Sequence, residues 1–418
     1  MNIQEYLVPL CQKAKETSRK VALLSTTVKN NVLLTLAELL LKQEKEILQE
    51  NLKDLESARD RKLDPAKIER LTLNRKRLEE MAAGLKEIAA LPDPVGEIES
   101  MEKRPNGMMV GKMRVPIGVI AIIYESRPNV TVDSAGLCLK SGNGVILKGG
   151  SEALHSNQKL ASLISDSLNH FGVPEGAVTF INQTDRAVTT ELLKMDKAID
   201  LVIPRGGEGL IRAVSEVSRI PVIKHDKGLC HIYVDSGANL EMAKKIVLNA
   251  KIQRPGTCNA LESLLIHEQV APQLLPDLLD KFNQRGIEVR GCPETQKYGE
   301  FVKPATEADY HTEYLELILS IKVVPSFEKA TEHIEKYGSN HTESIITDNY
   351  HQGLRFLNEV DASAVMVNAS TRLNDGYQFG LGAEIGISTS RIHARGPMGL
   401  KELTSQKFIV LGTGQIRE

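Results

Sequence analysis

The feature that most constrains the fold is a regular alternation of short apolar runs with helical stretches, which begins at Gly118. Alternation of this kind predicts a parallel β-sheet with helices on both faces. Because open αβ sheets bind ligands beyond the carboxyl ends of their strands, we expect a nucleotide site in the loops after these runs. The apolar runs are Val119–Ile123, Val145–Leu147, Val178–Ile181, Leu201–Ile203 and Val222–Ile223.

A second αβ series begins at His231 and predicts a second parallel sheet. A chain of 418 residues is too long for a single hydrophobic core. The fold class that fits both observations is α/β, with two doubly wound αβα domains. The elements of the second series are His231–Val234, Ala243–Lys251, Leu264–Ile266, Val323–Val324, Ile345–Ile346 and Val365–Val367.

The regions outside these two series have their own signals. Residues 1–95 show helical spacing of leucines such as Leu33, Leu36 and Leu40. Between Ile98 and Val115, alternating segments flank an Asn-Gly pair, which predicts a β-hairpin. This hairpin has little apolar content to bury by itself, so we expect it to lean on another domain or subunit. The tail 403–418 is strand-like.

Charge and composition exclude several classes of function. The formal net charge is −2, so no field draws the chain to nucleic acid or to an anionic membrane. No apolar stretch is long enough to span a bilayer, and the first residues lack the features of a signal peptide, so we expect a cytoplasmic protein. The five cysteines are scattered and the ten histidines lack ligand spacing, so we expect neither a disulfide framework nor a metal site.

Cys258 is the strongest candidate for a nucleophile. It follows the turn-forming pair Pro255-Gly256, and the residues Asn259–Ser263 are predicted to start a helix. A thiol at a helix N-terminus gains thiolate character, and the N–H groups of such a turn can form part of an oxyanion hole. A buried structural cysteine explains the same pattern equally well, so the spacing alone does not decide.

Two glycine-rich turns follow apolar runs and suit a phosphate-bearing ligand. The first places Lys148 before Gly149-Gly150, and Ser151 can cap the helix that follows. The second places Gly206, Gly207 and Gly209 after the run that ends at Ile203. Each turn alone is weak evidence, because glycines at such places often serve only close packing. Their occurrence at corresponding strand ends favours a nucleotide site.

Three polar segments are further candidates. The segment 391–397 carries Arg391, His393 and Arg395, so binding of an anionic substrate competes there with ordinary surface exposure. His341 follows Gly-Ser-Asn in a predicted loop and is a better site candidate than His333 on a helix. The segment 224–228 is a polar stretch that ends 30 residues before Cys258, and a hinge between domains explains it equally well.

Taken together, several long motifs resemble the aldehyde dehydrogenase superfamily over nearly the whole chain. Their order along the chain makes the resemblance stronger than any one motif. Within the superfamily, the match is to the branch of enzymes that reduce L-glutamyl 5-phosphate. The motifs are Pro116–Val130, Ser141–Asn157, Gln253–Glu262, Glu332–Ile346 and Tyr377–Pro397.

The resemblance implies a division of the chain and a cofactor. Lys148 would lie near the adenosine ribose of NADP, beside Gly149, Ser151 and Glu152, and the second turn would approach the pyrophosphate or nicotinamide. The resemblance also implies a homo-oligomer. The implied parts are an NADP-binding domain at 1–97 and 117–228, a catalytic domain at 229–375 that carries Cys258, and an oligomerisation flap at 98–116 and 400–418.

One departure from the superfamily pattern bears on the chemistry. Members that hydrolyse their thioester carry a Glu upstream of the cysteine, and here that place holds His225-Asp226-Lys227-Gly228. A missing general base favours exchange of the acyl group with phosphate over hydrolysis. The implied reaction is the NADPH-dependent reduction of L-glutamyl 5-phosphate to glutamate 5-semialdehyde and phosphate through a Cys258 thioester, in proline biosynthesis.

The resemblance also suggests roles for residues and a partner. Cys258 and Asn129 would hold the oxyanion, and glutamate 5-kinase would supply the acyl phosphate. Two alternatives stay open: a hydrolytic or CoA-acylating aldehyde dehydrogenase that acts on another semialdehyde, and a non-catalytic protein on the same fold. The residues implied to bind the substrate are Arg127, Lys224, His341, Arg391 and Arg395.

Overall fold

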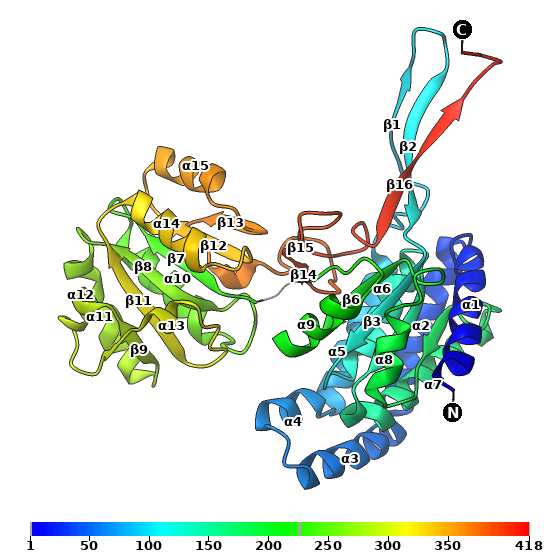
Figure 1. Cartoon of the computed structure of the whole chain (residues 1–418), viewed down its shortest axis with the longest axis horizontal. Coiled ribbons are helices and arrows are strands. Elements are labelled where there is room, and N and C mark those ends of the chain that lie inside the picture. The colour runs from blue at the N-terminus through cyan, green and yellow to red at the C-terminus, as the bar shows by residue number, and fades with distance from the viewer. Residues whose placement is uncertain (1, 225–226, 418) are drawn as a thin grey trace. The chain divides into compact units, whose positions relative to one another are not determined.

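The structure, a computed structural model, describes residues 2–224 and 227–417. Each of its two compact units contains its own parallel sheet (Figure 1). The predicted fold class, two αβ domains with parallel sheets, is therefore confirmed. Unit 1 comprises Met1–Lys224, Gly380–Gly386 and Met398–Glu418, and unit 2 comprises His225–Phe379 and Ile387–Pro397.

Unit 1 is built on a four-stranded parallel sheet with the order β5-β4-β3-β6. Every residue of β3 and β4 is buried, which explains why these strands appear in the sequence as continuous apolar runs without alternation. The predicted run Val222–Ile223 contributes only one isolated bridge, from Val222 to Val202. The strands are β3 (Val119–Tyr124), β4 (Gly144–Gly149), β5 (Val178–Phe180) and β6 (Leu201–Arg205).

Helices cover the sheet of unit 1, and the helical character predicted for residues 1–95 is confirmed. On one face, Leu7, Cys11 and Ala14 of α1 share a buried cluster with Val119 and Ala121 of β3. The helices are α1 (Ile3–Val21), α2 (Thr26–Lys42), α3 (Glu44–Asp60), α4 (Pro65–Leu71), α5 (Arg75–Ala90), α6 (Asn129–Lys140), α7 (Leu154–His170), α8 (Arg186–Leu192) and α9 (Glu208–Val217), with a 3₁₀ turn η1 at Ser151–Ala153.

A buried carboxylate of α3 caps helix α7, which directly follows the first glycine-rich turn. The N-cap residue of α7 makes no side-chain bond to the helix. Instead, Asp54 accepts hydrogen bonds from His155 N (3.1 Å), Ser156 N (2.8 Å) and Ser156 Oγ (2.6 Å). The first N–H groups of a helix lack partners within it and carry a partial positive charge. Asp54 therefore fixes the start of α7 and, with it, the end of the turn that contains Lys148.

The predicted hairpin is present and forms part of a three-stranded antiparallel sheet, which we call the flap (Figure 1). Strand β1 (Ile98–Lys103) pairs with β2 (Met109–Pro116), and Gly107 adopts a positive φ of 91° at the turn between them. Strand β16 (Thr404–Leu411) pairs with β2 from Thr404↔Pro116 to Leu411↔Met109. The tail of the chain thus completes a sheet that the hairpin begins.

Unit 2 contains a seven-stranded parallel sheet with the order β10-β9-β11-β8-β7-β12-β13. Its strands are β7 (Cys230–Val234), β8 (Leu261–His267), β9 (Glu288–Gly291), β10 (Lys303–Pro304), β11 (Ile318–Val324), β12 (Thr342–Ile346) and β13 (Ala364–Val367). Its helices are α10 (Leu240–Ile252), α11 (Ala271–Gln284), α12 (Pro293–Gln296), α13 (Glu307–Tyr310), α14 (Phe327–Tyr337) and α15 (Tyr350–Glu359), with a 3₁₀ turn η2 at Thr371–Leu373 and a small pair formed by β14 (Ile387–Ser388) and β15 (Gly396–Pro397).

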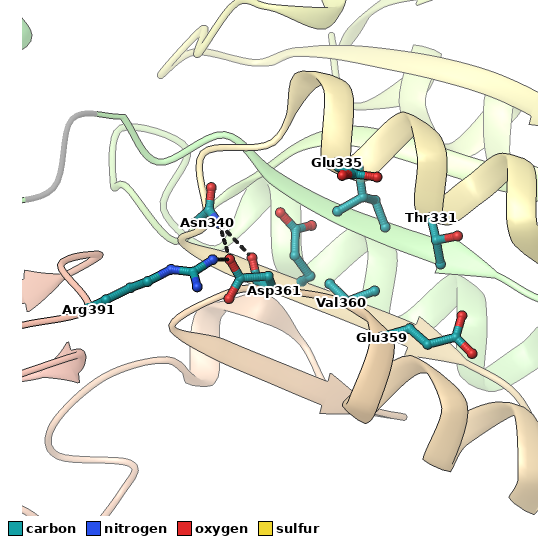
Figure 2. A pocket seen from close by; sticks show the side chains of 9 residues that line it. Thr331, Glu335, Asn340, Glu359, Val360, Asp361 and Arg391 are labelled. Atoms are coloured by element: carbon teal, nitrogen blue, oxygen red, sulfur yellow. Dashed lines mark hydrogen bonds and ion pairs between the residues drawn. The ribbon is translucent and has the colours of Figure 1, made fainter.

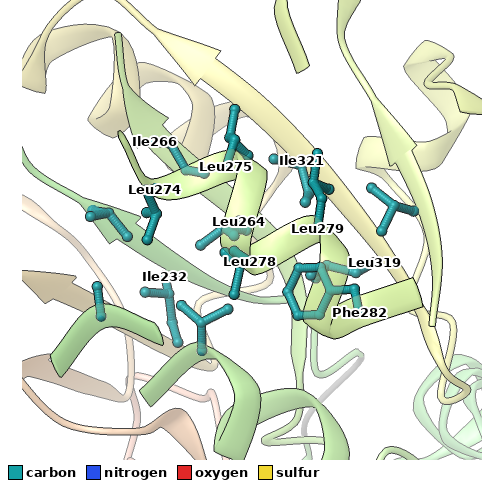
Figure 3. Close-up of a cluster of buried hydrophobic side chains, with 14 of the residues drawn as sticks. Ile232, Leu264, Ile266, Leu274, Leu275, Leu278, Leu279, Phe282, Leu319 and Ile321 are labelled. Atoms are coloured by element: carbon teal, nitrogen blue, oxygen red, sulfur yellow. The ribbon is translucent and has the colours of Figure 1, made fainter. Parts of the chain in front are cut away.

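The core of unit 2 lies on both faces of this sheet. On one face, leucines and Phe282 of α11 pack against Ile232 of β7 and Leu264 of β8 (Figure 3). On the other face, Tyr233 of β7 and Leu265 of β8 pack with residues of α14 and α15. Neighbouring residues of one strand therefore face opposite layers, as the two-residue period of a strand requires. None of the helices in the described parts of the chain has the length and apolar character of a membrane span.

The capping role of Asp54 can be tested by Asp54→Ala. We expect the substitution to lower the free energy of unfolding by about 2 kcal/mol, because it leaves the buried N–H and O–H of Ser156, and the partly buried N–H of His155, without their acceptor. Urea denaturation followed by circular dichroism measures this change. The exposed Asp60→Ala, at the end of the same helix, serves as control and should stay within about 0.5 kcal/mol of the parent. Equal stability of both variants would contradict the capping role.

Candidate active site

Three segments that carry candidate residues meet at the amino edge of the sheet of unit 2. Cys230 is the first residue of β7, Cys258 lies in the turn before β8, and His341 directly precedes β12. Because β7 lies between β8 and β12 in the sheet, the amino ends of these strands are neighbours. The candidate nucleophile thus lies at the edge opposite to the one that usually binds ligands in open αβ sheets.

The helix predicted to follow Cys258 is not formed. Residues Leu261–His267 form strand β8, which is buried along its whole length between β7 and β11. Pairing on both sides and burial of both faces outweigh the local helical preference of Asn259–Ser263. The prediction of a helix after Cys258 is therefore wrong. The argument that the dipole of such a helix increases the thiolate character of Cys258 fails with it.

Close packing against the segment before β7 holds the Cys258 turn instead. A Cβ added at Gly228 would overlap the carbonyl oxygen of Cys258 and lie 2.5 Å from its Cα. No side chain fits there, so the two backbones touch. The thiol of Cys230 also donates a hydrogen bond to the carbonyl oxygen of Cys258 at 3.2 Å. The peptide that follows Cys258 is thus fixed from the side of β7.

Side chains of η2 and the residues after it hold the same turn from another side. The guanidinium of Arg372 donates to Asn259 Oδ1 and, at 2.8 Å, to Gln253 Oε1. Asn259 Nδ2 in turn donates to Asn374 O at 2.9 Å. Arg372 thus spans the turn from Gln253 to Asn259. Neither Arg372 nor Gly228 was among the predicted site residues.

An ion pair in the protein interior joins the two ends of the segment that contains the turn. Lys251 Nζ at the end of α10 lies 2.8 Å from Glu262 Oε2 in β8, and both side chains are fully buried. Burial raises the pKa of Glu262 to about 7 even though the neighbouring ammonium lowers it. Burial also lowers the pKa of Lys251, against the effect of the carboxylate. Removal of one partner would leave an uncompensated buried charge, which is costly.

His341 is fully buried and takes part in a polar network behind Cys258. Its Nδ1 lies 2.7 Å from Thr342 Oγ1 and 3.7 Å from Cys230 Sγ. Thr342 Oγ1 also accepts a hydrogen bond from Asn374 Nδ2 at 2.7 Å. The network therefore reaches the Cys258 turn through Cys230 and through Asn374. Of the predicted site residues of unit 2, the structure brings His341 and Cys258 together in this way.

The predicted anion-binding arginines of the 391–397 loop share one carboxylate. Asp361 forms ion pairs with Arg395, at 2.7 Å, and with Arg391, and these contacts keep the pKa of Asp361 below its usual value. Figure 2 shows the contact with Arg391. Arg391 also lines a pocket of about 380 Å³. The other lining residues are Thr331, Ile334, Glu335, Asn340, Glu343, Glu359, Val360 and Asp361. Its lining carries four carboxyl groups and one guanidinium, so it does not favour an anion.

In unit 1, the turns after β3, β4 and β6 meet at the carboxyl edge of the sheet, where the sequence places the nucleotide site. Ser126 follows β3 with a positive φ of 46°, and its N and Oγ donate to Glu152 Oε1 at 2.6 and 2.8 Å. Glu125 N donates to Arg205 O at 3.1 Å. Glu152, predicted to contact the cofactor, therefore holds two of these turns together in the structure.

The glycines of the second turn differ in what surrounds them. A Cβ at Gly206 would lie 2.6 Å from Leu210 Cδ2 and 2.7 Å from Glu125 Oε2, so a side chain there would displace the ends of these two side chains. A Cβ at Gly207 or Gly209 would meet nothing within 4 Å. These two positions border open space at the start of α9, a helix N-terminus that favours negative charge, and there Gly207 N donates to Glu125 Oε2 at 3.3 Å. Packing within unit 1 does not explain why they are glycines.

The remaining predicted residues of unit 1 lie in or near the same turns. Lys148 is 5% exposed, donates to Gly149 O at 3.0 Å and has its pKa lowered by burial. Asn129, the first residue of α6, donates from Nδ2 to Asp133 Oδ2 at 2.9 Å. Burial raises the pKa of Asp133 to about 6, although this hydrogen bond lowers it. Ser151 is exposed and Arg127 is half-buried.

The end of unit 1 and the start of unit 2 carry the last predicted residues. Lys224 ends the first of the three segments of unit 1. His225 and Asp226, which stand where hydrolytic enzymes of the resembled superfamily carry Glu, lie outside the described residues. Across residues 2–224 and 227–417, no group of three or more His, Cys, Asp or Glu side chains could hold a metal ion.

Comparison with known proteins identifies relatives along the whole chain. A family model described as the aldehyde dehydrogenase family matches residues 5–312. The gamma-glutamyl phosphate reductase of Thermodesulfovibrio yellowstonii is 55% identical over 418 residues, which is 100% of both chains. That of Moorella thermoacetica is 53% identical over the same length, again 100% of both chains.

Solved structures agree with these relatives. The crystal structure of gamma-glutamyl phosphate reductase from Thermotoga maritima matches with a TM-score of 0.96 at 48% identity, and the match covers 99% of this chain and 100% of that one. A glyceraldehyde-3-phosphate dehydrogenase from Methanocaldococcus jannaschii, solved in complex with NADP, matches with a TM-score of 0.70 at 15% identity over 98% and 95% of the two chains. The second likeness concerns the fold alone.

The contact between Gly228 and Cys258 can be tested by Gly228→Ala. The added methyl group overlaps the Cys258 backbone, so the turn must move, and we expect the alkylation rate of Cys258 by iodoacetamide to change at least about tenfold. Gly237→Ala is the matched control. Gly237 lies in the loop after β7, the strand that Gly228 precedes, and a Cβ there would have only ordinary contacts at 3.7 Å or more. Parent-like alkylation in the Gly228 variant would show that the turn tolerates a side chain there.

Proposed function

We propose, from the premise that this chain belongs to the aldehyde dehydrogenase family, that it reduces L-glutamyl 5-phosphate with NADPH. The products are L-glutamate 5-semialdehyde and phosphate, in the second step of proline biosynthesis. The observation that carries this proposal is identity of 53–55% over the full chain to relatives named gamma-glutamyl phosphate reductase. Members of the family with this name act on the acyl phosphate that the name describes.

Cys258 acts as the nucleophile. Its thiolate attacks the acyl carbon, a C–S bond forms, and the C–O bond to phosphate breaks with its electron pair on the phosphate oxygen, which leaves a thioester. Burial supports this choice of cysteine. Cys258 is partly exposed, whereas Cys11, Cys138, Cys230 and Cys292 are buried. The N–H of Cys258 stabilises the oxyanion. Asn129 is the second donor that the family resemblance implies, and Asp133 orients its side-chain amide.

A nicotinamide cofactor serves the family, and the residues of unit 1 fit one. The open space at Gly207 and Gly209 and the N-terminus of α9 suit a pyrophosphate. Lys148 and Gly149 end β4 and Ser151 begins η1, and a basic residue at this place favours the additional phosphate of NADPH. When bound, NADPH supplies the hydride that reduces the thioester. The residues of this chain position the cofactor, exclude water and hold the acyl group on Cys258.

The anionic ends of the substrate require cationic partners. Arg127 and Lys224 of unit 1 and Arg391 and Arg395 of unit 2 are the predicted set. His341 contributes indirectly in this proposal, because it is buried and contacts the Cys258 turn through Cys230.

Glutamate 5-kinase supplies the labile acyl phosphate. Reduction of the product of a cytoplasmic kinase, by an enzyme that needs a free thiol, places the reaction in the cytoplasm.

The reaction can be tested by Cys258→Ala. We expect turnover to be lost, because no other described cysteine is exposed enough to replace the nucleophile, whereas the affinity for NADPH stays within about threefold of the parent. Activity is measured in the reverse direction, as reduction of NADP by glutamate semialdehyde. That reduction must require inorganic phosphate. Oxidation without phosphate would identify a hydrolytic enzyme instead, and oxidation that requires CoA would identify a CoA-acylating one.

The flap joins copies of the chain in this proposal. Phe408 and Val410 on β16 are 70% and 55% exposed, and two positions apart they share a face of the flap sheet. Apolar side chains exposed on a sheet mark an interaction surface. We expect the double substitution Phe408→Glu and Val410→Glu to reduce the mass measured by light scattering to that of a monomer. Thr413→Glu, in the exposed tail beyond β16, is the control. An unchanged mass would exclude this face as the interface.

A further inference from the structure

We propose that Arg254 and Arg372 form the binding site for the phosphate group of the substrate, directly beside Cys258. This inference rests on the proposed function, because it names the site that receives the leaving group of that reaction. Neither residue was expected from the sequence to bind substrate. Both belong to unit 2, as Cys258 does.

The two arginines are placed on the turn that carries the nucleophile. Arg254 begins the turn, and its carbonyl oxygen accepts a hydrogen bond from Thr257 Oγ1 at 2.8 Å, next to Cys258. Arg372 reaches the turn from η2 and bonds to Gln253 and Asn259, the residues that precede Arg254 and follow Cys258. The Arg372 guanidinium is thus held against residues on both sides of Cys258, and Arg254 belongs to the same turn.

Each guanidinium keeps capacity for a ligand. The two hydrogen bonds of Arg372 use two of the five N–H groups of a guanidinium, so three remain. Arg254 is exposed, and its side chain has no hydrogen bond or ion pair to the described residues. Arg372, half-buried, also has no carboxylate within ion-pair distance in that part of the chain.

The electrostatic surroundings of Arg372 also favour an anion. Burial lowers the pKa of Arg372, the nearby positive charge of Arg254 lowers it further, and Cys258 and Asp375, which forms no ion pair with Arg372, raise it. Two like charges beside each other with no ion-paired carboxylate are stabilised when an anion binds between them. In contrast, Arg391 and Arg395 already share Asp361, and Arg391 lines a pocket rich in carboxyl groups.

The chemistry of the first step requires a phosphate site at this place. In an acyl phosphate, a single oxygen separates phosphorus from the carbon that the sulfur attacks. As the C–S bond forms and the C–O bond breaks, the electron pair stays on phosphate, whose negative charge rises by one before it takes up a proton from water. Guanidinium groups stabilise that charge bidentately. The α-carboxylate lies at the other end of the substrate, so it remains for the other cationic residues.

The first test compares two alkylating reagents of similar size. Iodoacetate is an anion and iodoacetamide is neutral, so the ratio of their rates at Cys258 reports an anion site beside the thiol. We expect Arg254→Gln and Arg372→Gln each to lower this ratio about tenfold or more, because a hydrogen bond to a charged group is lost. A change in the thiolate fraction affects both reagents alike and cancels in the ratio. Inorganic phosphate should slow iodoacetate in the parent.

The second test measures the reverse reaction. We expect the KM for inorganic phosphate to rise about ten- to hundredfold in each variant, while the KM for NADP stays unchanged. Arg285→Gln, an exposed arginine at the end of α11, is the control for loss of a positive charge. Arg254→Gln keeps the test valid if Arg372→Gln disturbs the turn, because the Arg254 side chain holds no other described residue.

The outcomes separate the two proposals. An unchanged reagent ratio together with an unchanged KM for phosphate overturns the phosphate site. A rise in the KM for semialdehyde instead of phosphate also overturns it, because the arginines then bind the α-carboxylate. If the parent enzyme reduces NADP without phosphate, the proposed function fails, whatever the reagent ratio shows. The alkylation test needs neither cofactor nor turnover, so it reports on the arginines alone.

Discussion

The contact between Gly228 and the backbone of Cys258 is the constraint on which the site of unit 2 depends. Because the two backbones touch, the segment before β7 and the turn before β8 cannot shift independently, so β7 and this turn move as one body. Cys230 adds a hydrogen bond to the same carbonyl, and Arg372 ties the two ends of the turn. The partly exposed thiol is therefore carried by a rigid support, formed by the backbone at Gly228 and by the side chains of Cys230 and Arg372.

Local sequence signals predicted the features that local physics determines. The Asn-Gly pair at 106–107 requires positive φ at its glycine and gave the hairpin its turn. Strands buried on both faces showed as apolar runs, and helices at the N-terminus showed their spacing. The same reasoning failed after Cys258, because Asn259–Ser263 suits a helix when considered alone. Its strand conformation comes from β7 and β11, which pair with it from distant parts of the sequence, and from Lys251, which neutralises Glu262.

The site was predictable only in part, for a related reason. A turn that exposes a cysteine can be recognised from Pro-Gly, and glycine-rich turns after strands can be recognised as anion sites. Which cations remain available to a substrate cannot be read in this way. Asp361 lies 30 residues before Arg391, and Arg372 lies 113 residues after Asn259, so neither pairing has a local signature. Only the folded arrangement separates arginines that already have a carboxylate from those that do not.

The flap has a consequence for the order in which the chain folds during its synthesis. Strand β2 pairs on one side with β1, which is made just before it, but on the other side with β16, which includes Leu411. Until β16 has been synthesised, one edge of β2 stays unpaired, and unpaired strand edges can pair with wrong partners. Lys112 on β2 and Lys407 on β16 place charges along these strands. The sheet that would join two copies is thus finished only after β16 has been made, which delays association by the flap until that point.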